Sequence, residues 1–252
     1  MTALNHIAIV VALREELDAL SAAVQTLAEP LRTRVRVSQG GIGLEAATKA
    51  AESAVLVPDL MLLCSSGFSG GCSEAAAVGT VVLADSICTL PPPTASFASY
   101  KIRPPVLVDE AAAKKARQAL QAVGLPFHCG PLVVASTPVL QGADKRAVGL
   151  AFRALAVDME CGAVEQVART HSIPFLALRA ISDGVQDDLP EEIGEFLDQD
   201  GSVRLGKVTR FAFKHPKNVG VLLKLKDHAA KASAALTLAW QAVLPELLND
   251  VS

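Results

Sequence analysis

The sequence lacks the usual marks of a membrane protein or a nucleic-acid-binding protein. Its formal net charge is -3 over 252 residues and its pI is about 6.0, so we expect no basic surface for a nucleic acid. Hydrophobic residues make up 51% of the chain, yet the apolar runs are too short to predict an integral membrane segment. Since no basic leader precedes the first apolar run, we expect a strand there and not a signal peptide.

Cysteine and histidine are also scarce, with five of each and none in a recognisable ligand spacing. The cysteines are odd in number and form no C-x-x-C pair: Cys64, Cys72, Cys88, Cys129 and Cys161. Most lie beside apolar residues, which suits small core side chains and a cytoplasmic location. No histidines form H-E-x-x-H or another paired spacing, so we expect no metal and no cofactor.

The chain does contain apolar runs of strand length that alternate with helical patterns. The runs are 6–13, 34–38, 59–66, 80–87, 130–136, 153–158 and 174–182, and helical spacing occurs in 14–27, 44–56, 109–123 and 162–171. This alternation predicts an α/β fold with a central mixed, largely parallel sheet flanked by helices. Because the chain has no internal repeat and no linker, residues 1–252 are predicted to form a single domain.

Two further stretches do not follow this alternation of strands and helices. The proline-rich run 91–105 predicts a surface loop, of a kind that often borders a binding site. Residues 184–202 are acidic and loop-like, and residues 203–244 predict two or three helices, two of them separated at His215-Pro216. We therefore expect a helical C-terminus after the last strand.

Acidic residues follow the first and a later predicted strand, at the edge where open α/β sheets bind ligands. Glu15 and Glu16 follow the first strand, where a solvated first helical turn is the alternative interpretation. The stretch "VDMECGAVEQ" places Asp158 and Glu160 between a buried strand and a helix. A carboxylate there is costly unless it is hydrated, paired or bound to a ligand.

A glycine cluster and a serine-aspartate pair end two other strands. "SSGFSGG" (65–71) predicts a turn whose backbone N–H groups converge on an anion or a hydroxyl-rich ligand, and a tight turn without a ligand is the alternative. "RAISDGVQDD" contains Arg179, Ser182 and Asp183, where an aspartate also suits a helix cap. We expect these groups to form one site with the carboxylates.

The glycine cluster also matches G-x-S-x-G, the nucleophile elbow of serine hydrolases, through Ser69. That elbow requires a substantial helix after the turn, and only "SEAAA" follows here. A serine hydrolase with Ser69 as nucleophile and His215 as its base therefore remains an alternative with weak support. No G-x-G-x-x-G follows the first strand, so a dinucleotide site is not predicted.

In their order and context, several motifs together resemble the nucleoside phosphorylase and nucleosidase superfamily, above all the methylthioadenosine/S-adenosylhomocysteine nucleosidases. These motifs are "VALREELDAL", "GGIG", "SSGFSGG", "VDMECGAVEQVA" and "PFLALRAISD". The C-terminal part, residues 189–232, looks more like the hopanoid-associated phosphorylases of bacteria. That branch is associated with removal of adenine from adenosylhopane. The resemblance implies cleavage of the N-glycosidic bond of an adenine nucleoside through an oxocarbenium-like transition state, by hydrolysis or phosphorolysis. It also implies a homo-oligomer.

The resemblance implies a role for each polar residue. Asp183 would protonate the five-membered-ring nitrogen of the purine, for which it must hold a proton near neutral pH. Glu16 would position the attacking water, Glu160 would hold the ribose hydroxyls, and Met159 would pack against the sugar. The remaining implied substrate-binding residues are Arg179, which would orient Glu160, and Ser66, Gly67, Val139, Leu140 and Ser182. Asp158 is interpreted as structural.

Three departures from the family pattern bear on the substrate. Val139 stands where the nucleosidases usually stack an aromatic ring on the base. No basic residue adjoins the glycine motifs to hold phosphate, the possible co-substrate, and Arg14 is the one substitute in view. The stretch between the first two strands is shortened, which with the 91–105 loop favours a bulky or lipid-like 5′ substituent.

Two further interpretations of the whole chain stay open at this point. The basic stretch 210–226 would suit peripheral membrane contact, or simply a solvated helix face. A nucleoside-binding protein without activity is also possible on this fold. The joint presence of Glu16, Glu160 and Asp183 counts against it, because binding alone does not need the acid.

Overall fold

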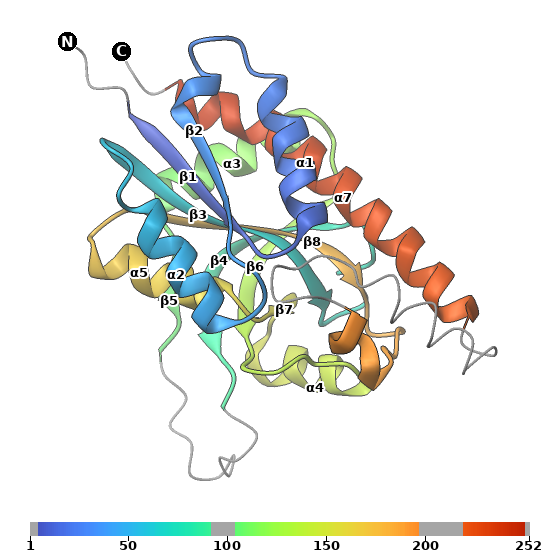
Figure 1. The fold of residues 1–252 in the computed structure, drawn as a ribbon. Helices are drawn as coiled ribbons and strands as arrows, with labels where there is room; N and C mark the ends of the chain where they lie inside the picture. Colours follow the sequence, from blue (N-terminus) through green and yellow to red (C-terminus); the bar gives the residue numbers. More distant parts are fainter. Residues whose placement is uncertain (1–4, 92–103, 197–218, 250–252) are drawn as a thin grey trace.

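The computed structural model describes residues 5–91, 104–196 and 219–249 (Figure 1). Its strands are β1 (His6–Val11), β2 (Val35–Gln39), β3 (Leu60–Gly71), β4 (Val81–Thr89), β5 (Val106–Leu107), β6 (Phe127–Val134), β7 (Ala156–Asp158) and β8 (Phe175–Asp183). Its helices are α1 (Arg14–Gln25), α2 (Leu44–Ala54), α3 (Glu110–Ala122), α4 (Gly142–Phe152), α5 (Cys161–Thr170) and α7 (Val219–Leu248). Short 3-10 turns span η1 (Arg32–Arg34) and η2 (Glu191–Phe196).

The strands form one mixed sheet whose centre closes on itself. The order is β2-β1-β3-β7-β6-β4-β5, and β8 pairs with both β3 and β4. β3, β7, β6, β4 and β8 therefore form a closed ring of hydrogen-bonded strands. Five of the eight pairings are parallel, and β3–β7, β4–β5 and β4–β8 are antiparallel. The predicted α/β fold with a mixed, largely parallel sheet and a helical C-terminus is confirmed.

Helices cover the two faces of the sheet with separate hydrophobic cores. The buried side chains of α1, α3 and α7 belong to one core and those of α2 and α5 to the other. The long helix α7 packs on both α1 and α3 (Figure 1). It buries Trp240 completely, and the indole Nε1 donates a hydrogen bond to Ser66 Oγ at 2.7 Å. The C-terminal helix thus supports the strand that leads to the candidate site.

The predicted glycine-rich turn at 65–71 is wrong, because β3 continues through it to Gly71. The backbone from Leu63 to Gly70 pairs with β8, and Gly70 and Gly71 also pair with β7. Hydrogen bonds to two neighbouring strands outweigh the local turn signal of the glycines. A Cβ at Gly71 would collide with the carbonyl oxygen of Ala76, so this glycine serves close backbone approach.

Helix α4 and the short strand β5 were not predicted from the sequence. The buried positions of α4 are Gly142, Lys145 and Val148, so a lysine stands in the middle of the buried stripe and no apolar period reveals the helix. After residue 218 the structure has one continuous helix, α7, which agrees with a predicted helix after His215-Pro216. The predicted break at His215-Pro216 and most of the 91–105 loop lie outside the described residues.

Candidate functional site

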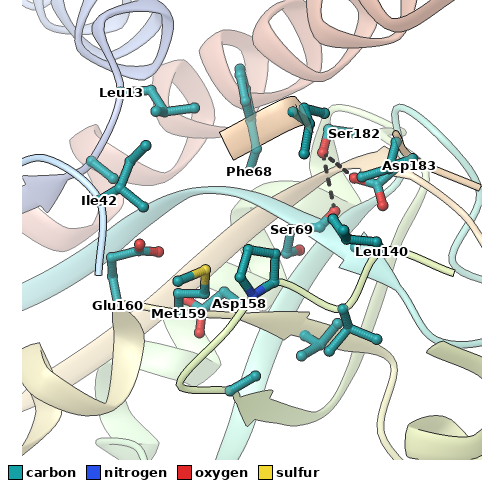
Figure 2. A pocket seen from close by; sticks show the side chains of 18 of the residues that line it. Leu13, Ile42, Phe68, Ser69, Leu140, Asp158, Met159, Glu160, Ser182 and Asp183 are labelled. Atoms are coloured by element: carbon teal, nitrogen blue, oxygen red, sulfur yellow. Dashed lines mark hydrogen bonds between the residues drawn. The ribbon is translucent and has the colours of Figure 1, made fainter. Parts of the chain in front are cut away.

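A cavity of about 220 Å³ lies at the ends of several strands of the ring. Its lining comes from the segments that end or follow β1, β3, β6, β7 and β8. Figure 2 shows Glu160 and Asp183 on opposite sides of this space, with Met159 beside Glu160 and Ser182 beside Asp183. The strand-end edge predicted from the sequence is therefore where the polar residues gather.

Most of the predicted site residues line the cavity, namely Glu16, Val139, Leu140, Met159, Glu160, Ser182 and Asp183. Ser66, Gly67 and Arg179 do not belong to this lining. Ser66 accepts the bond from Trp240, and Arg179 is 2% exposed within β8. These two side chains lie behind the cavity wall, where they can position other groups.

Glu16 is held tightly between the start of α1 and β3. Its Oε2 accepts hydrogen bonds from the N–H groups of Ala12 (2.8 Å) and Leu13 (2.9 Å), and its Oε1 accepts one from Phe68 (2.7 Å). The residue is 3% exposed, so a solvated first helical turn does not describe it. Burial raises the pKa of Glu16, while the backbone donors oppose that change.

Gly67 explains how Glu16 reaches β3. Its φ of 150° lies in a region that side chains rarely adopt, and a Cβ there would lie 2.5 Å from Glu16 Oε1. The glycine therefore leaves the space that the carboxylate occupies. This is the one role that the structure gives to the predicted residue Gly67.

Glu160 lies just before α5 and reaches across to the loop that precedes α2. Its Oε1 accepts a hydrogen bond from Gly43 N–H at 2.8 Å. Burial and the negative charge of Asp158 raise the pKa of Glu160 to about 7, against the lowering effect of the Gly43 bond. Near neutral pH the free carboxyl group is thus poised between its two protonation states.

Arg179 contacts Asp158 and not Glu160. Its Nη2 donates to Asp158 Oδ2 and, at 2.7 Å, to Ser65 Oγ. Arg179 was predicted to orient Glu160, and the structure shows an effect of its charge on the pKa of Glu160 and a direct contact with Asp158. Asp158 Oδ2 also accepts from Cys161 N–H at 3.2 Å, which ties the ion pair to the start of α5. Both partners are almost fully buried.

Asp183 ends β8 with both carboxylate oxygens engaged. Ser182 Oγ donates to Oδ1 at 2.8 Å, and Lys145 Nζ lies 2.6 Å from Oδ2. Lys145 is completely buried. Sequence reasoning missed this lysine, because nothing in "GADKRAVGLAF" reveals that α4 turns it inward. Its Nζ is thus the basic group that contacts Asp183.

The part of the wall that follows β6 contains Val139 and Leu140. The Leu140 carbonyl accepts a hydrogen bond from Leu189 N–H at 3.0 Å, which ties this segment to the loop after β8. Leu189 also lines the cavity. The wall is thus apolar at Val139, Leu140 and Leu189.

No lysine or arginine appears among the described residues that line the cavity. The predicted substitute, Arg14, pairs with Asp18 at 3.1 Å on the exposed face of α1. Within residues 5–91, 104–196 and 219–249 there is also no cluster of three potential metal ligands. No helix in these ranges is long and apolar enough to cross a membrane.

The structure does not support the serine-hydrolase alternative. Ser69 lies inside β3 and is 5% exposed, so the strand–turn–helix of a nucleophile elbow is not formed around it. His215, the predicted base, lies outside the described residues.

Comparison with known proteins relates most of the chain to one family. Residues 6–211 match the family model of the phosphorylase superfamily. The futalosine hydrolase of Helicobacter pylori strain 26695 is similar in structure, with a TM-score of 0.73 and 16% identity, over 96% of this chain and 98% of that one. The 5′-methylthioadenosine/S-adenosylhomocysteine nucleosidase of Neisseria meningitidis, solved with methylthio-immucillin-A, has a TM-score of 0.69 and 16% identity, over 95% and 98%.

A third similar structure is the 5′-methylthioadenosine/S-adenosylhomocysteine nucleosidase of Helicobacter pylori. Its TM-score is 0.71 and its identity 15%, over 97% of this chain and all of that one. At such identities the likeness shows a shared fold along nearly the full length.

Proposed function

The chain belongs to the phosphorylase superfamily, and from that premise we propose that it hydrolyses the N-glycosidic bond of an adenine nucleoside. The position of Glu16 is the observation that favours water over phosphate as the nucleophile. Its carboxylate already accepts a hydrogen bond, at 2.7 Å, from the Phe68 N–H in the glycine-rich strand. A phosphate dianion there would meet a carboxylate and lose a backbone donor.

The absence of a basic side chain from the described cavity lining also favours water over phosphate. Phosphate sites in proteins are built from lysine or arginine side chains or from converging backbone donors. The described lining offers neither an ammonium nor a guanidinium. A water molecule needs only an acceptor to orient it, and Glu16 lines the cavity with a carboxylate whose pKa is raised by burial.

Departure of the base requires a proton, since a purine anion is a poor leaving group. We assign this transfer to Asp183, which ends β8 and accepts a hydrogen bond from Ser182. It would share a hydrogen bond with the five-membered-ring nitrogen and pass the proton as the bond to the sugar breaks. Leu140 and Val139 would enclose the base.

The sugar would lie near Glu160 and Met159. An ionised Glu160 accepts hydrogen bonds from the ribose hydroxyls, and its negative charge stabilises the oxocarbenium cation as that charge develops. Met159 supplies an apolar, polarisable contact to the sugar face. The water that Glu16 holds then adds to the cation, and the Glu16 carboxylate accepts the proton that this water loses.

The 5′ substituent is the least constrained part of this proposal. Leu13, Ile42 and Phe68 provide apolar lining near Glu16 and Glu160. Such a lining suits a methylthio, thioether or larger apolar group, which covers both the methylthioadenosine type and the adenosylhopane type of substrate. We retain the prediction of a homo-oligomer, which sedimentation velocity would test.

The decisive experiment measures adenine release from 5′-methylthioadenosine, S-adenosylhomocysteine, adenosine and an adenosylhopane analogue, with and without phosphate. Release without phosphate is expected, and Glu16→Gln should reduce it about 10²-fold. Glu15→Gln is the matched control on the same turn and should leave the rate unchanged. Release that depends on phosphate would make the chain a phosphorylase, and no release from any of the four would reject the substrate class.

A further inference from the structure

Among the residues that the structure describes, Lys145 is the one basic side chain that is completely buried beside the candidate acid. It comes from α4, a helix whose remaining buried positions are Gly142 and Val148. Its Nζ lies 2.6 Å from Asp183 Oδ2 and donates to the carbonyls of Asp187 (2.9 Å) and Gly184 (3.2 Å). The three hydrogens of an ammonium group therefore have three acceptors.

The surroundings of Lys145 are shaped to bring its side chain to this point. A Cβ at Gly70 would lie 3.5 Å from Lys145 Cδ and 3.2 Å from Asp183 Oδ2. The glycine thus leaves room for the aspartate oxygen, while the lysine stem would lie at ordinary van der Waals distance from such a Cβ. A fully buried lysine is costly to place, and the cost is reduced only by a close anionic partner and by satisfied hydrogen bonds.

The loop after β8 does not depend on Lys145 alone. Gly184 N–H donates to Asp187 Oδ2 at 2.8 Å, and Lys224 of α7 pairs with Asp187 Oδ1 at 2.6 Å. Asp188 Oδ1 accepts from Gly142 N–H at 2.9 Å and ties the loop to the start of α4. Because these contacts already hold the loop, the contact that distinguishes Lys145 is the one to Asp183.

We propose that Lys145 is a positioning residue for glycosidic-bond cleavage, which acts through Asp183 on the leaving base. The inference rests on the proposed function. Ser182 and Lys145 hold one carboxylate oxygen each, so together they set the plane and the rotation of the Asp183 carboxyl group. Lys145 does not contact the substrate and has no part at the Glu160 side of the cavity.

This role predicts a loss that depends on the leaving group. Adenine needs a proton to leave, so its release depends on the placement of Asp183. The 4-nitrophenolate of a 4-nitrophenyl riboside leaves without a proton, so its release depends on the sugar and the nucleophile alone. A lysine that merely supports the fold would affect both substrates equally.

The experiment compares kcat and KM for the best adenine nucleoside and for 4-nitrophenyl riboside in the full-length protein. Lys145→Met should lower kcat for the nucleoside about 10²-fold, with KM nearly unchanged, and should leave 4-nitrophenyl riboside within about threefold. Lys145→Arg, which keeps a cation, should recover part of the loss. Arg146→Met is the matched control, because Arg146 pairs with Glu74 on the exposed face of α4 and should behave as the unchanged protein.

A double variant makes the same distinction without the second substrate. If Lys145 acts through Asp183, Lys145→Met adds no further loss of nucleoside cleavage to Asp183→Asn, and this combination also leaves no unpaired buried charge. Equal losses on both substrates, additive losses in the double variant, or an unchanged Lys145→Met enzyme would overturn the proposal. A wild-type protein inactive on every nucleoside would instead reject the proposed function itself, and this inference with it.

Discussion

The two ends of the cavity hold carboxylates in opposite electrostatic surroundings. At the Glu160 end, formed by Glu16, Asp158, Glu160 and Arg179, a single guanidinium faces three buried or half-buried carboxyl groups and contacts only Asp158. At the Asp183 end, formed by Lys145, Ser182 and Asp183, one carboxylate has one ammonium at 2.6 Å. The first end holds three carboxyl groups and one basic group, and the second holds one of each.

This difference in charged groups agrees with the role of each end in the proposed reaction. A cation develops on the sugar, and an excess of carboxylate charge nearby lowers its energy. On the base the requirement is geometrical, because a proton must reach one ring nitrogen. Burial and carboxylate neighbours raise the pKa of Glu160 to about 7, so the Glu160 end should respond to pH near neutrality.

The largest effect is expected at the Asp183 end. Asp183→Asn keeps the size of the side chain but removes the transferable proton, so kcat for an adenine nucleoside should fall about 10³-fold, or about 4 kcal/mol of barrier. Binding of a non-hydrolysable nucleoside, measured by calorimetry, should survive. Turnover close to the wild-type rate would show that Asp183 is not the acid.

At the Glu160 end the largest effect should be on stability. Asp158→Asn leaves Arg179 buried without its contacting anion, which should lower the free energy of unfolding by about 3 kcal/mol in urea. The control is Glu165→Gln, since Glu165 pairs with Arg169 at 3.0 Å and that arginine is exposed. Its loss should stay below about 1 kcal/mol. An equal decrease in the free energy of unfolding in both variants would mean that the buried pair stabilises the protein no more than the exposed pair does.

The pH dependence should separate the two ends further. Because the folded-state pKa of Glu160 is raised from 4.5 to about 7, the folded protein binds more protons than the unfolded chain between these values. The contribution of Glu160 to the free energy of unfolding is therefore fully present below pH 4.5. It falls as pH rises towards 7, by at most about 3 kcal/mol. Glu160→Gln should remove this fall, as urea unfolding at several pH values would show. A parallel pH dependence in the variant would contradict the assignment.

Activity should change with pH in the opposite direction at the same group. An ionised Glu160 is needed to accept the ribose hydroxyls, so kcat/KM should rise as pH passes through about 7. Asp158→Asn removes a charge that raises this pKa, so in that variant the rise should move to lower pH. An unshifted profile would indicate that another group controls the rise.

The smallest effect is expected for Arg14→Ala. Arg14 lies outside the cavity lining in an exposed pair with Asp18, so the rate and its dependence on phosphate should stay the same and stability should change by less than about 0.5 kcal/mol. A selective loss of a phosphate-dependent reaction would bring Arg14 back as an anion-binding residue.

The strand ends could be predicted because their signals are local. The apolar runs that became β1, β7 and β8 are each followed directly by the polar residues that line the cavity, and parallel strands bring such ends to one edge. Glu16, Glu160 and Asp183 all line the cavity, and their roles there stay a prediction. The run 65–71 was misjudged, because glycines read locally as a turn while pairing with β7 and β8 makes them strand.

The sequence by itself determined the α/β fold, the strand-end position of the carboxylates and the family. Only the tertiary structure decided which charges meet: Arg179 with Asp158, and Lys145 with Asp183. The physical reason is that charge interactions depend on distance and burial between elements far apart in the chain. Hydrophobic periodicity describes one element at a time, and a lysine on the buried face of α4 breaks even that signal.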